Sequence, residues 1–110
     1  MSKNEPDLQR MAKDVASVLA ASLSRDLPEM QSVAVSFLKS REKRLKQLTA
    51  LRLKSAISDA ELLSELEDEK LALETKLLSL KVISAMAIQD AANAAIHAIQ
   101  QSILNCLKIL

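Results

Sequence analysis

The 110-residue chain contains no glycine, and this absence restricts the fold more than any other feature of the sequence. Tight hairpin turns and β-bulges commonly use glycine to reach positive φ angles. The usual phosphate-binding and calcium-binding loops also need glycine at fixed positions. The common residues here are instead helix formers such as Ala, Leu, Lys and Glu. The sequence therefore predicts a single all-α domain over residues 1–110 and excludes those glycine-dependent sites in their usual forms.

Two short stretches carry signals for the start of a helix. In the first, Asp26 can cap a helix and Pro28 suits its first turn. In the second, Ser58 is followed three residues later by Glu61, which is the spacing of a capping box. These signals predict three helices, over roughly residues 6–25, 27–56 and 59–108.

The second and third predicted helices form a long antiparallel hairpin that turns at residues 56–59, and the first is a short N-terminal helix. If it is unbroken, the third helix extends for about 75 Å at 1.5 Å per residue. The sequence leaves its continuity open, because a break near Asn93 has no clear signal.

Each predicted helix has an apolar stripe at the i, i+3, i+4, i+7 spacing of a helix that packs on one side. The stripe of the first helix is Leu8, Met11, Ala12, Val15, Val18, Leu19 and Leu23. The stripe of the second is Met30, Val33, Ala34, Phe37, Leu38, Leu45, Leu48 and Leu51. The early part of the third contributes Leu62, Leu63, Leu66, Leu73, Leu77 and Leu80. We expect these stripes to face one another inside the hairpin.

Charges are sorted by sign on the two sides of the predicted turn. Arg41, Arg44 and Arg52 fall within the apolar stripe of the second helix, whereas the lysines fall on its opposite side. An antiparallel hairpin that turns at Ser58 would place Arg41 near Glu74, Arg44 near Glu69, and Arg52 near Glu61 or Glu65. Each exposed pair contributes only about 0–1 kcal/mol. We therefore expect these pairs mainly to select the register of the hairpin.

From residue 82 onward, polar side chains occupy a narrow stripe and the rest of the helix surface is apolar. This face is wider than the roughly 100° of an ordinary surface helix. Because a hairpin has no second neighbour to cover it, the sequence predicts that other copies of the chain do so, as a homo-oligomeric bundle or a filament. The expected interface is Ala87, Ile88, Ala91, Ala94, Ala95, Ala98, Ile99 and Ile103.

Two other uses of this face stay open. It could bind an amphipathic helix of another protein, in which case the chain is a small adaptor or chaperone. It could also lie on a lipid surface, although its polar stripe has Gln, Asn and His instead of the Lys and Arg typical of such helices.

Reactive and metal-binding groups are scarce. His97 and Cys106 are nine residues apart and point to opposite sides of one helix, so they cannot form a nucleophile–base pair within a chain. No glutamate precedes His97 at the spacing of a bundle di-metal site. We therefore expect a structural protein that is not an enzyme, with no catalytic, cofactor-binding or metal-binding residues.

Nucleic acid and membrane are disfavoured as partners. The run at residues 39–47 is basic, and its contacts would be Lys39, Lys43 and Lys46, but the chain has a net charge of +1 and a single aromatic residue to stack on bases. Residues 82–104 contain too many polar side chains for a membrane span. The first ten residues have no apolar segment like that of a cleaved signal peptide, so we expect a cytoplasmic protein, with secretion by another route left open.

Overall fold

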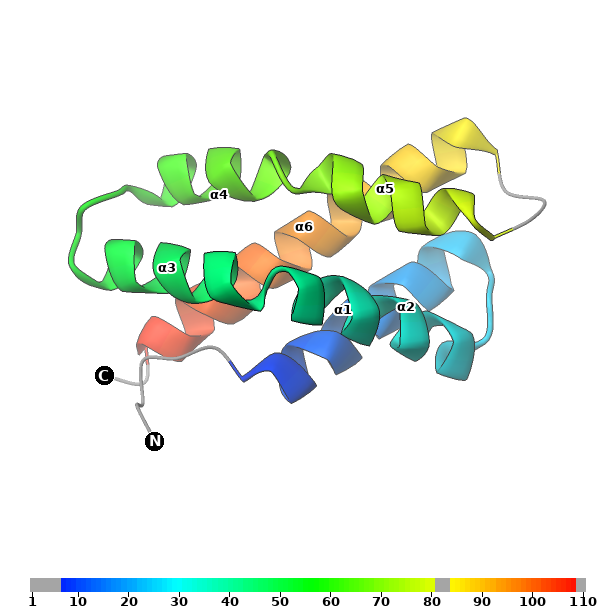
Figure 1. Cartoon of the computed structure of the whole chain (residues 1–110), viewed down its shortest axis with the longest axis horizontal. Coiled ribbons are helices and arrows are strands. Elements are labelled where there is room, and N and C mark those ends of the chain that lie inside the picture. Colours follow the sequence, from blue (N-terminus) through cyan, green and yellow to red (C-terminus); the bar gives the residue numbers. More distant parts are fainter. Residues whose placement is uncertain (1–6, 81–83, 109–110) are drawn as a thin grey trace.

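The computed structural model describes residues 7–80 and 84–108 (Figure 1). These residues form helices and connecting turns, with no strand among them. The helices are α1 (Leu8–Leu23), α2 (Leu27–Ser40), α3 (Glu42–Leu53), α4 (Asp59–Glu67), α5 (Lys70–Leu78) and α6 (Ala85–Lys108). The predicted all-α fold is confirmed.

Helix α1 matches the predicted N-terminal helix, with clear caps at both ends. The side chain of Asp7 accepts hydrogen bonds from the backbone N–H groups of Gln9 and Arg10. At the other end, Ser24 takes a left-handed conformation with φ of 53°, a position that glycine usually fills. The chain thus ends this helix at some conformational cost, because it has no glycine to place there.

The predicted helix over residues 27–56 is two helices, α2 and α3. They meet at Arg41, whose φ and ψ of −115° and 10° depart from helical values, and the Ser40 hydroxyl donates to the Phe37 carbonyl just before this bend. Helix α3 ends at Leu53, three residues earlier than predicted. Ser55 has a positive φ of 59° and lies in the connection to α4. The turn therefore starts earlier than the expected 56–59 segment.

The capping box at Ser58 is confirmed. Ser58 Oγ accepts from the Glu61 N–H at 3.1 Å, and the Ser58 N–H donates to Glu61 Oε1 at 2.9 Å. These reciprocal bonds satisfy two backbone donors that the first turn of α4 would otherwise leave unpaired. A short turn at residues 68–69 then separates α4 from α5.

The predicted single helix over residues 59–108 is wrong: this segment contains α4, α5 and α6. The main break follows Ser79, and α6 begins after Ser84. The Ser84 hydroxyl accepts from the Ala87 N–H at 3.1 Å, as in a helix N-cap. Asn93, where the sequence left a break open, lies inside α6.

Because of this break, α6 folds back along α4 and α5. The Lys70 ammonium donates to Asn93 Oδ1 at 2.8 Å, and the Gln100 side-chain amide donates to the Asp59 carbonyl at 3.2 Å. These two contacts show that α6 runs antiparallel to α4–α5, and α6 crosses that pair diagonally in Figure 1. The molecule is accordingly 43 Å long, well short of the rod that an unbroken helix would form.

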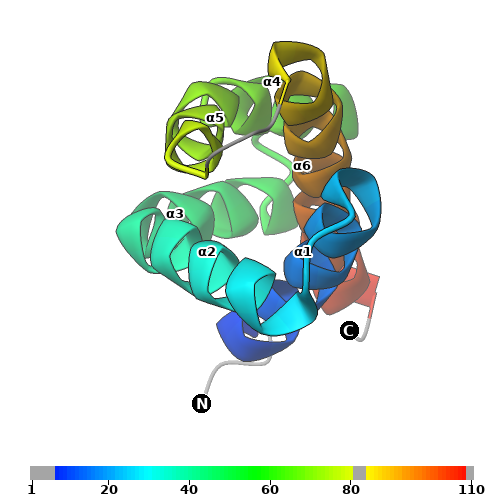
Figure 2. The ribbon, with the colours of Figure 1, turned by 90° about the vertical axis from the view of Figure 1, so that its right-hand side faces the viewer.

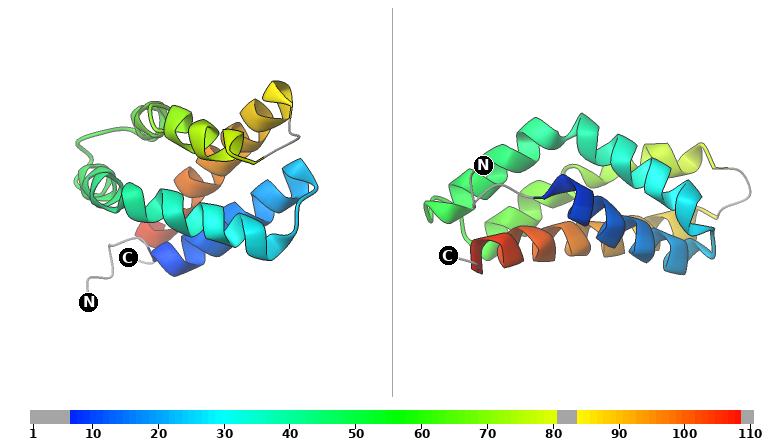
Figure 3. Two further views of the ribbon diagram at one scale, coloured as in Figure 1. Left: turned by 45° about the vertical axis from the view of Figure 1, so that its right-hand side comes forward. Right: turned by 90° about the horizontal axis from the view of Figure 1, so that it is seen from below.

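The bundle has three sides around one core. Seen end-on, the pair α4–α5, the pair α2–α3, and the two helices α1 and α6 surround a common interior (Figure 2). Helix α1 packs on both α2 and α6, so the first and last helices are neighbours (Figure 3). The predicted apolar stripes supply most of the core. Its largest fully buried side chains are Phe37, Met11, Leu19, Met30, Leu38, Leu45, Leu48, Leu62, Leu66, Leu73, Leu77 and Ile96.

Candidate functional site

The apolar face of α6, predicted to be an interface, lies in the core of the chain itself. Five of its eight residues are buried: Ile88, Ala91, Ala95, Ile99 and Ile103. The other three, Ala87, Ala94 and Ala98, are partly buried. Helix α1 covers one part of this face, and α4 and α5 cover another. The expectation that a single chain leaves this face open is therefore wrong.

The sequence argument failed because it counted neighbours for an unbroken helix. A helix over 59–108 could not pack against its own first half, so only the N-terminal helix remained as a neighbour. The break before Ser84 turns α4–α5 into the missing second neighbour. Small side chains assist the packing, because Ala12 and Ala16 on α1 and Ala91 and Ala95 on α6 are all buried and permit close approach of the helices.

The arginines of α2–α3 do face acidic side chains of α4–α5, in a register different from the predicted one. Arg44 Nη2 donates to Glu65 Oε2 at 2.5 Å. Arg41 Nε lies 3.2 Å from Glu69 Oε2 at an angle outside the hydrogen-bond range, which makes this contact an ion pair only. The third arginine pairs at the turn itself, outside the predicted set: Arg52 Nε donates to Asp59 Oδ1 at 2.5 Å.

The early end of α3 explains the shifted register. Since α3 stops at Leu53 and α4 starts at Asp59, the centre of the turn lies nearer the N-terminus than a fold at Ser58 would place it. Arg41 and Arg44 then each meet an acid about one helical turn earlier than predicted. Glu61 caps α4 instead, and Glu74 has no ion pair with any residue that the structure describes.

The most exposed large apolar side chains lie elsewhere, on α5 and the first turn of α6. Leu71 is 71% exposed, Leu78 is 64% exposed and Met86 is 73% exposed. The Lys70–Asn93 hydrogen bond sets the alignment of the two antiparallel helices. Leu77, seven residues after Lys70, is therefore level with Met86, seven residues before Asn93. Leu78 and Met86 are therefore at the same end of the bundle. We call Leu71, Leu78 and Met86 the exposed apolar surface.

Sequence reasoning missed this surface although a signal was present. Leu71 and Leu78 are seven residues apart, two turns of a helix, and neither belongs to the inward stripe that contains Leu73 and Leu77. In the structure Leu73 and Leu77 are fully buried on the opposite side of α5. Two leucines that repeat on the outer side of a helix are the kind of pattern that indicates a contact surface.

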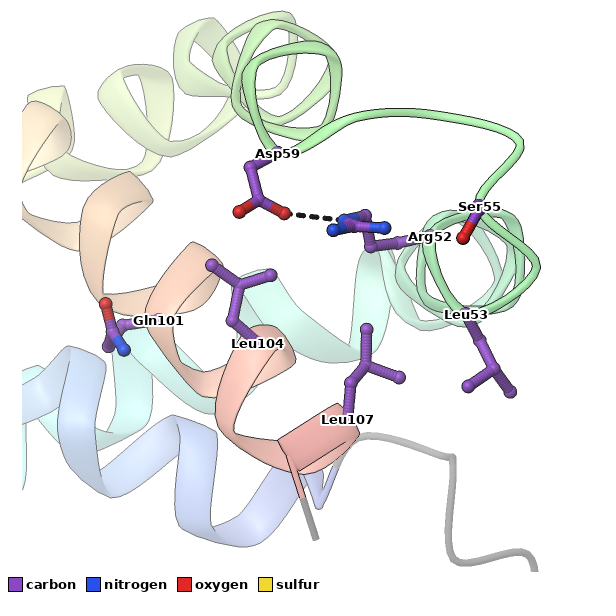
Figure 4. A pocket seen from close by; sticks show the side chains of 7 residues that line it. All are labelled: Arg52, Leu53, Ser55, Asp59, Gln101, Leu104 and Leu107. Carbon is purple, nitrogen blue, oxygen red and sulfur yellow. Dashed lines mark hydrogen bonds and ion pairs between the residues drawn. The ribbon is translucent and has the colours of Figure 1, made fainter. Parts of the chain in front are cut away.

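A depression of about 420 Å³ opens where α3 ends and the last turns of α6 pass (Figure 4). Leu104 and Leu107 of α6 point toward the Arg52–Asp59 ion pair, and Gln101 and Ser55 lie at the edge. Its charged groups neutralise each other, and no histidine or cysteine lines it. The arrangement provides no nucleophile–base pair for catalysis.

The remaining candidate groups lie apart from one another. His97 is exposed on α6, whereas Cys106 is half-buried and burial raises the pKa of its thiol. Over residues 7–80 and 84–107, no three His, Cys, Asp or Glu side chains lie together as a metal site would require. Lys39, Lys43 and Lys46 are exposed on the outside of α2–α3. Within the same residues no helix is long and apolar enough to span a bilayer.

The fold and these surfaces define an all-α helical bundle with a filled core and charged outer walls. Comparison with protein-family models, with curated proteins and with solved structures finds no match for the chain.

Proposed function

We propose that this chain is a non-enzymatic structural protein that associates with further copies of itself through the exposed apolar surface. The observation that carries the proposal is the position of Leu71, Leu78 and Met86, whose side chains are nearly two-thirds exposed or more and lie on neighbouring helices. Single exposed apolar residues are common on monomers, whereas exposed apolar residues that gather on one surface mark interaction sites. Leu71 and Leu78 support such a surface because they lie two helical turns apart on one side of α5.

The proposal keeps self-association and moves it from the inner face of α6 to the outer face of α5. The inner face has neighbours within the chain, so it has no need of another copy. The outer face has none among the residues that the structure describes. Burying a leucine fully is worth about 1.5–3 kcal/mol, and association itself costs several kcal/mol. We therefore expect reversible association that becomes evident as the protein concentration rises.

Sedimentation velocity over a range of about 10 μM to about 1 mM tests the proposal, because this range spans weak protein association. The weight-average mass should increase with concentration. The double substitution Leu71→Ser and Leu78→Ser removes about 2–4 kcal/mol of burial at each contact, which weakens association by roughly 30-fold to several hundred-fold. The control is Leu51→Ser, at a leucine of α3 that is 38% exposed and lies outside the apolar surface.

A mass that stays at one chain over the whole range would refute the proposal. Equal weakening by the control would also count against it, since the effect would then come from the general loss of exposed leucine. Circular dichroism of each variant confirms that its helices are retained.

A further inference from the structure

The outer wall of α4–α5 carries an ordered series of exposed residues. Successive residues of a helix turn by 100°, so Leu71, Thr75 and Leu78 share one side of α5. Ser64 and Asp68 continue this side onto α4, because the buried leucines of the opposite side, Leu62, Leu66, Leu73 and Leu77, keep the same spacing across the turn at residues 68–69. The residues of the outer side are all exposed, as is the neighbouring Glu67. The series is acidic at the α4–α5 junction and apolar toward the end of α5. We call these residues the acidic face.

The outer wall of α2–α3 carries a matching series with the opposite charge. By the same rotation, Pro28, Ser32, Val35 and Lys39 share one side of α2. Lys46, with Lys43 beside it, continues this side onto α3, because the buried Leu38 and Leu45 keep the same seven-residue spacing across the bend at Arg41; all these face residues are exposed. This wall is apolar near the start of α2 and basic from Lys39 onward. We call these residues the lysine face. In the end-on view, α2–α3 and α4–α5 form two separate walls of the bundle (Figure 2).

The two faces match from Lys39 to Pro28 when the helices run antiparallel. If Val35 is set against Leu71, then Lys39 falls beside Glu67 and Asp68, and Pro28 falls beside Leu78. On both faces the charged residue lies about one helical turn from the first apolar residue, Val35 or Leu71. The next apolar residue, Pro28 or Leu78, lies two turns beyond it. The same alignment places Ser32 beside Glu74 and Thr75, so polar residues also meet.

The charges on these faces are available for such a contact. The arginines of α2–α3 pair with acids of the same chain, whereas Lys39 and Lys43 have no ion pair with any described residue. Glu67 and Asp68 likewise have none within residues 7–80 and 84–107. The ion pair Lys46–Glu42 cancels two further charges on the lysine face, which leaves that face with a net positive charge.

From this match we infer that the occupant of the acidic face is the lysine face of a second copy of the chain. The inference rests on the proposed self-association and identifies its contact. Because the two surfaces differ, the contact is heterologous, and each added copy presents both faces again. Assembly by this contact therefore continues as an open series or closes as a ring, of which the smallest is a two-fold dimer with both contacts formed.

Charge reversal tests the inference. The lysine-face variant is Lys39→Glu with Lys43→Glu, and the acidic-face variant is Glu67→Lys with Asp68→Lys. Each variant alone should associate at least about tenfold more weakly than the unchanged chain, because like charges then meet across the contact. An equal mixture of the two should recover association, because each supplies the face that the other lacks. The matched controls, Arg10→Glu with Lys54→Glu and Asp14→Lys with Asp90→Lys, should leave association unchanged.

Disulfide cross-linking tests the register. In a Cys106→Ser background, chains with Val35→Cys should cross-link to chains with Leu71→Cys. Cross-linking of Leu71→Cys to Leu78→Cys chains, without the Val35 product, would instead show a symmetric α5–α5 contact and overturn the inference. The inference would also be overturned if the unchanged chain associates and the charge reversals do not weaken that association. A chain that stays monomeric at every concentration would refute the proposed function itself, so the two failures are distinguishable.

Discussion

Replacement of Ile99 by alanine tests whether the inner face of α6 is covered within one chain. Ile99 is 1% exposed, on the side of α6 that packs inward. Substitutions of buried isoleucine by alanine cost about 2–5 kcal/mol, because apolar burial is lost and a cavity is left. A domain of this size has a free energy of unfolding of about 5–15 kcal/mol. We expect Ile99→Ala to remove about 3 kcal/mol, a large share of the total.

The assay is denaturation followed by circular dichroism at two protein concentrations at least about twentyfold apart. With an unfolding entropy of roughly 2.1 cal/mol/K per residue, a loss of 3 kcal/mol lowers Tm by roughly 13 °C. Since the packing lies within one chain, the loss should be the same at both concentrations. The control is His97→Ala, an exposed position on the same helix, which should change stability by less than about 0.5 kcal/mol.

A different result would refute the reasoning. If other copies covered this face, Tm would rise with protein concentration and Ile99→Ala would reduce the mass of the assembly. If the face were not packed at all, the substitution would have almost no effect on the free energy of unfolding.

Two further predictions concern the start of α6 and its last turns. Ser84→Ala removes the hydroxyl that accepts from the Ala87 N–H, so the free energy of unfolding should fall by about 0.5–2 kcal/mol. Urea denaturation measures this loss, and Ser22→Ala, at an exposed serine, is the control. If Ser84→Ala causes no loss, Ser84 does not cap α6. Burial raises the pKa of the Cys106 thiol, and the thiolate is the reactive form. Iodoacetamide should therefore alkylate Cys106 at neutral pH more slowly than it alkylates the cysteine of a short unstructured peptide. The rate for Cys106 should increase as the pH rises. A rate equal to that of the peptide across this range would contradict the raised pKa.

The helical class and most of the core could be read from the sequence, because both depend on local patterns. The absence of glycine and the 3.6-residue repeat of apolar side chains predict helices whose inward residues, such as Met11, Phe37 and Leu66, are buried in the structure. The capping box at Ser58 was also recognisable, since it involves two residues three positions apart.

The break before α6 could not be predicted by the same means. It has no proline or glycine, and Ser84 has alanine, not glutamate, at the third position of its helix, so no capping box marks it. The candidate interface depended entirely on this break, because the path of the chain decides which neighbours a helix has. The arginine pairing was predicted in kind, and its register was missed because α3 ends at Leu53 instead of residue 56.

The packing of α1 against α6 has a consequence for synthesis on the ribosome. Translation produces α1 before α6, so the apolar side of α1 that α6 will cover has no partner there until α6 has also been made. Helices α1 and α2 can pair early because few residues separate them, whereas the contact of α1 with α6 joins segments that are far apart in the sequence. Nascent chains that stop short of α6 therefore expose the apolar surface of α1 that α6 would cover, and transiently exposed apolar surface of this kind is prone to aggregation.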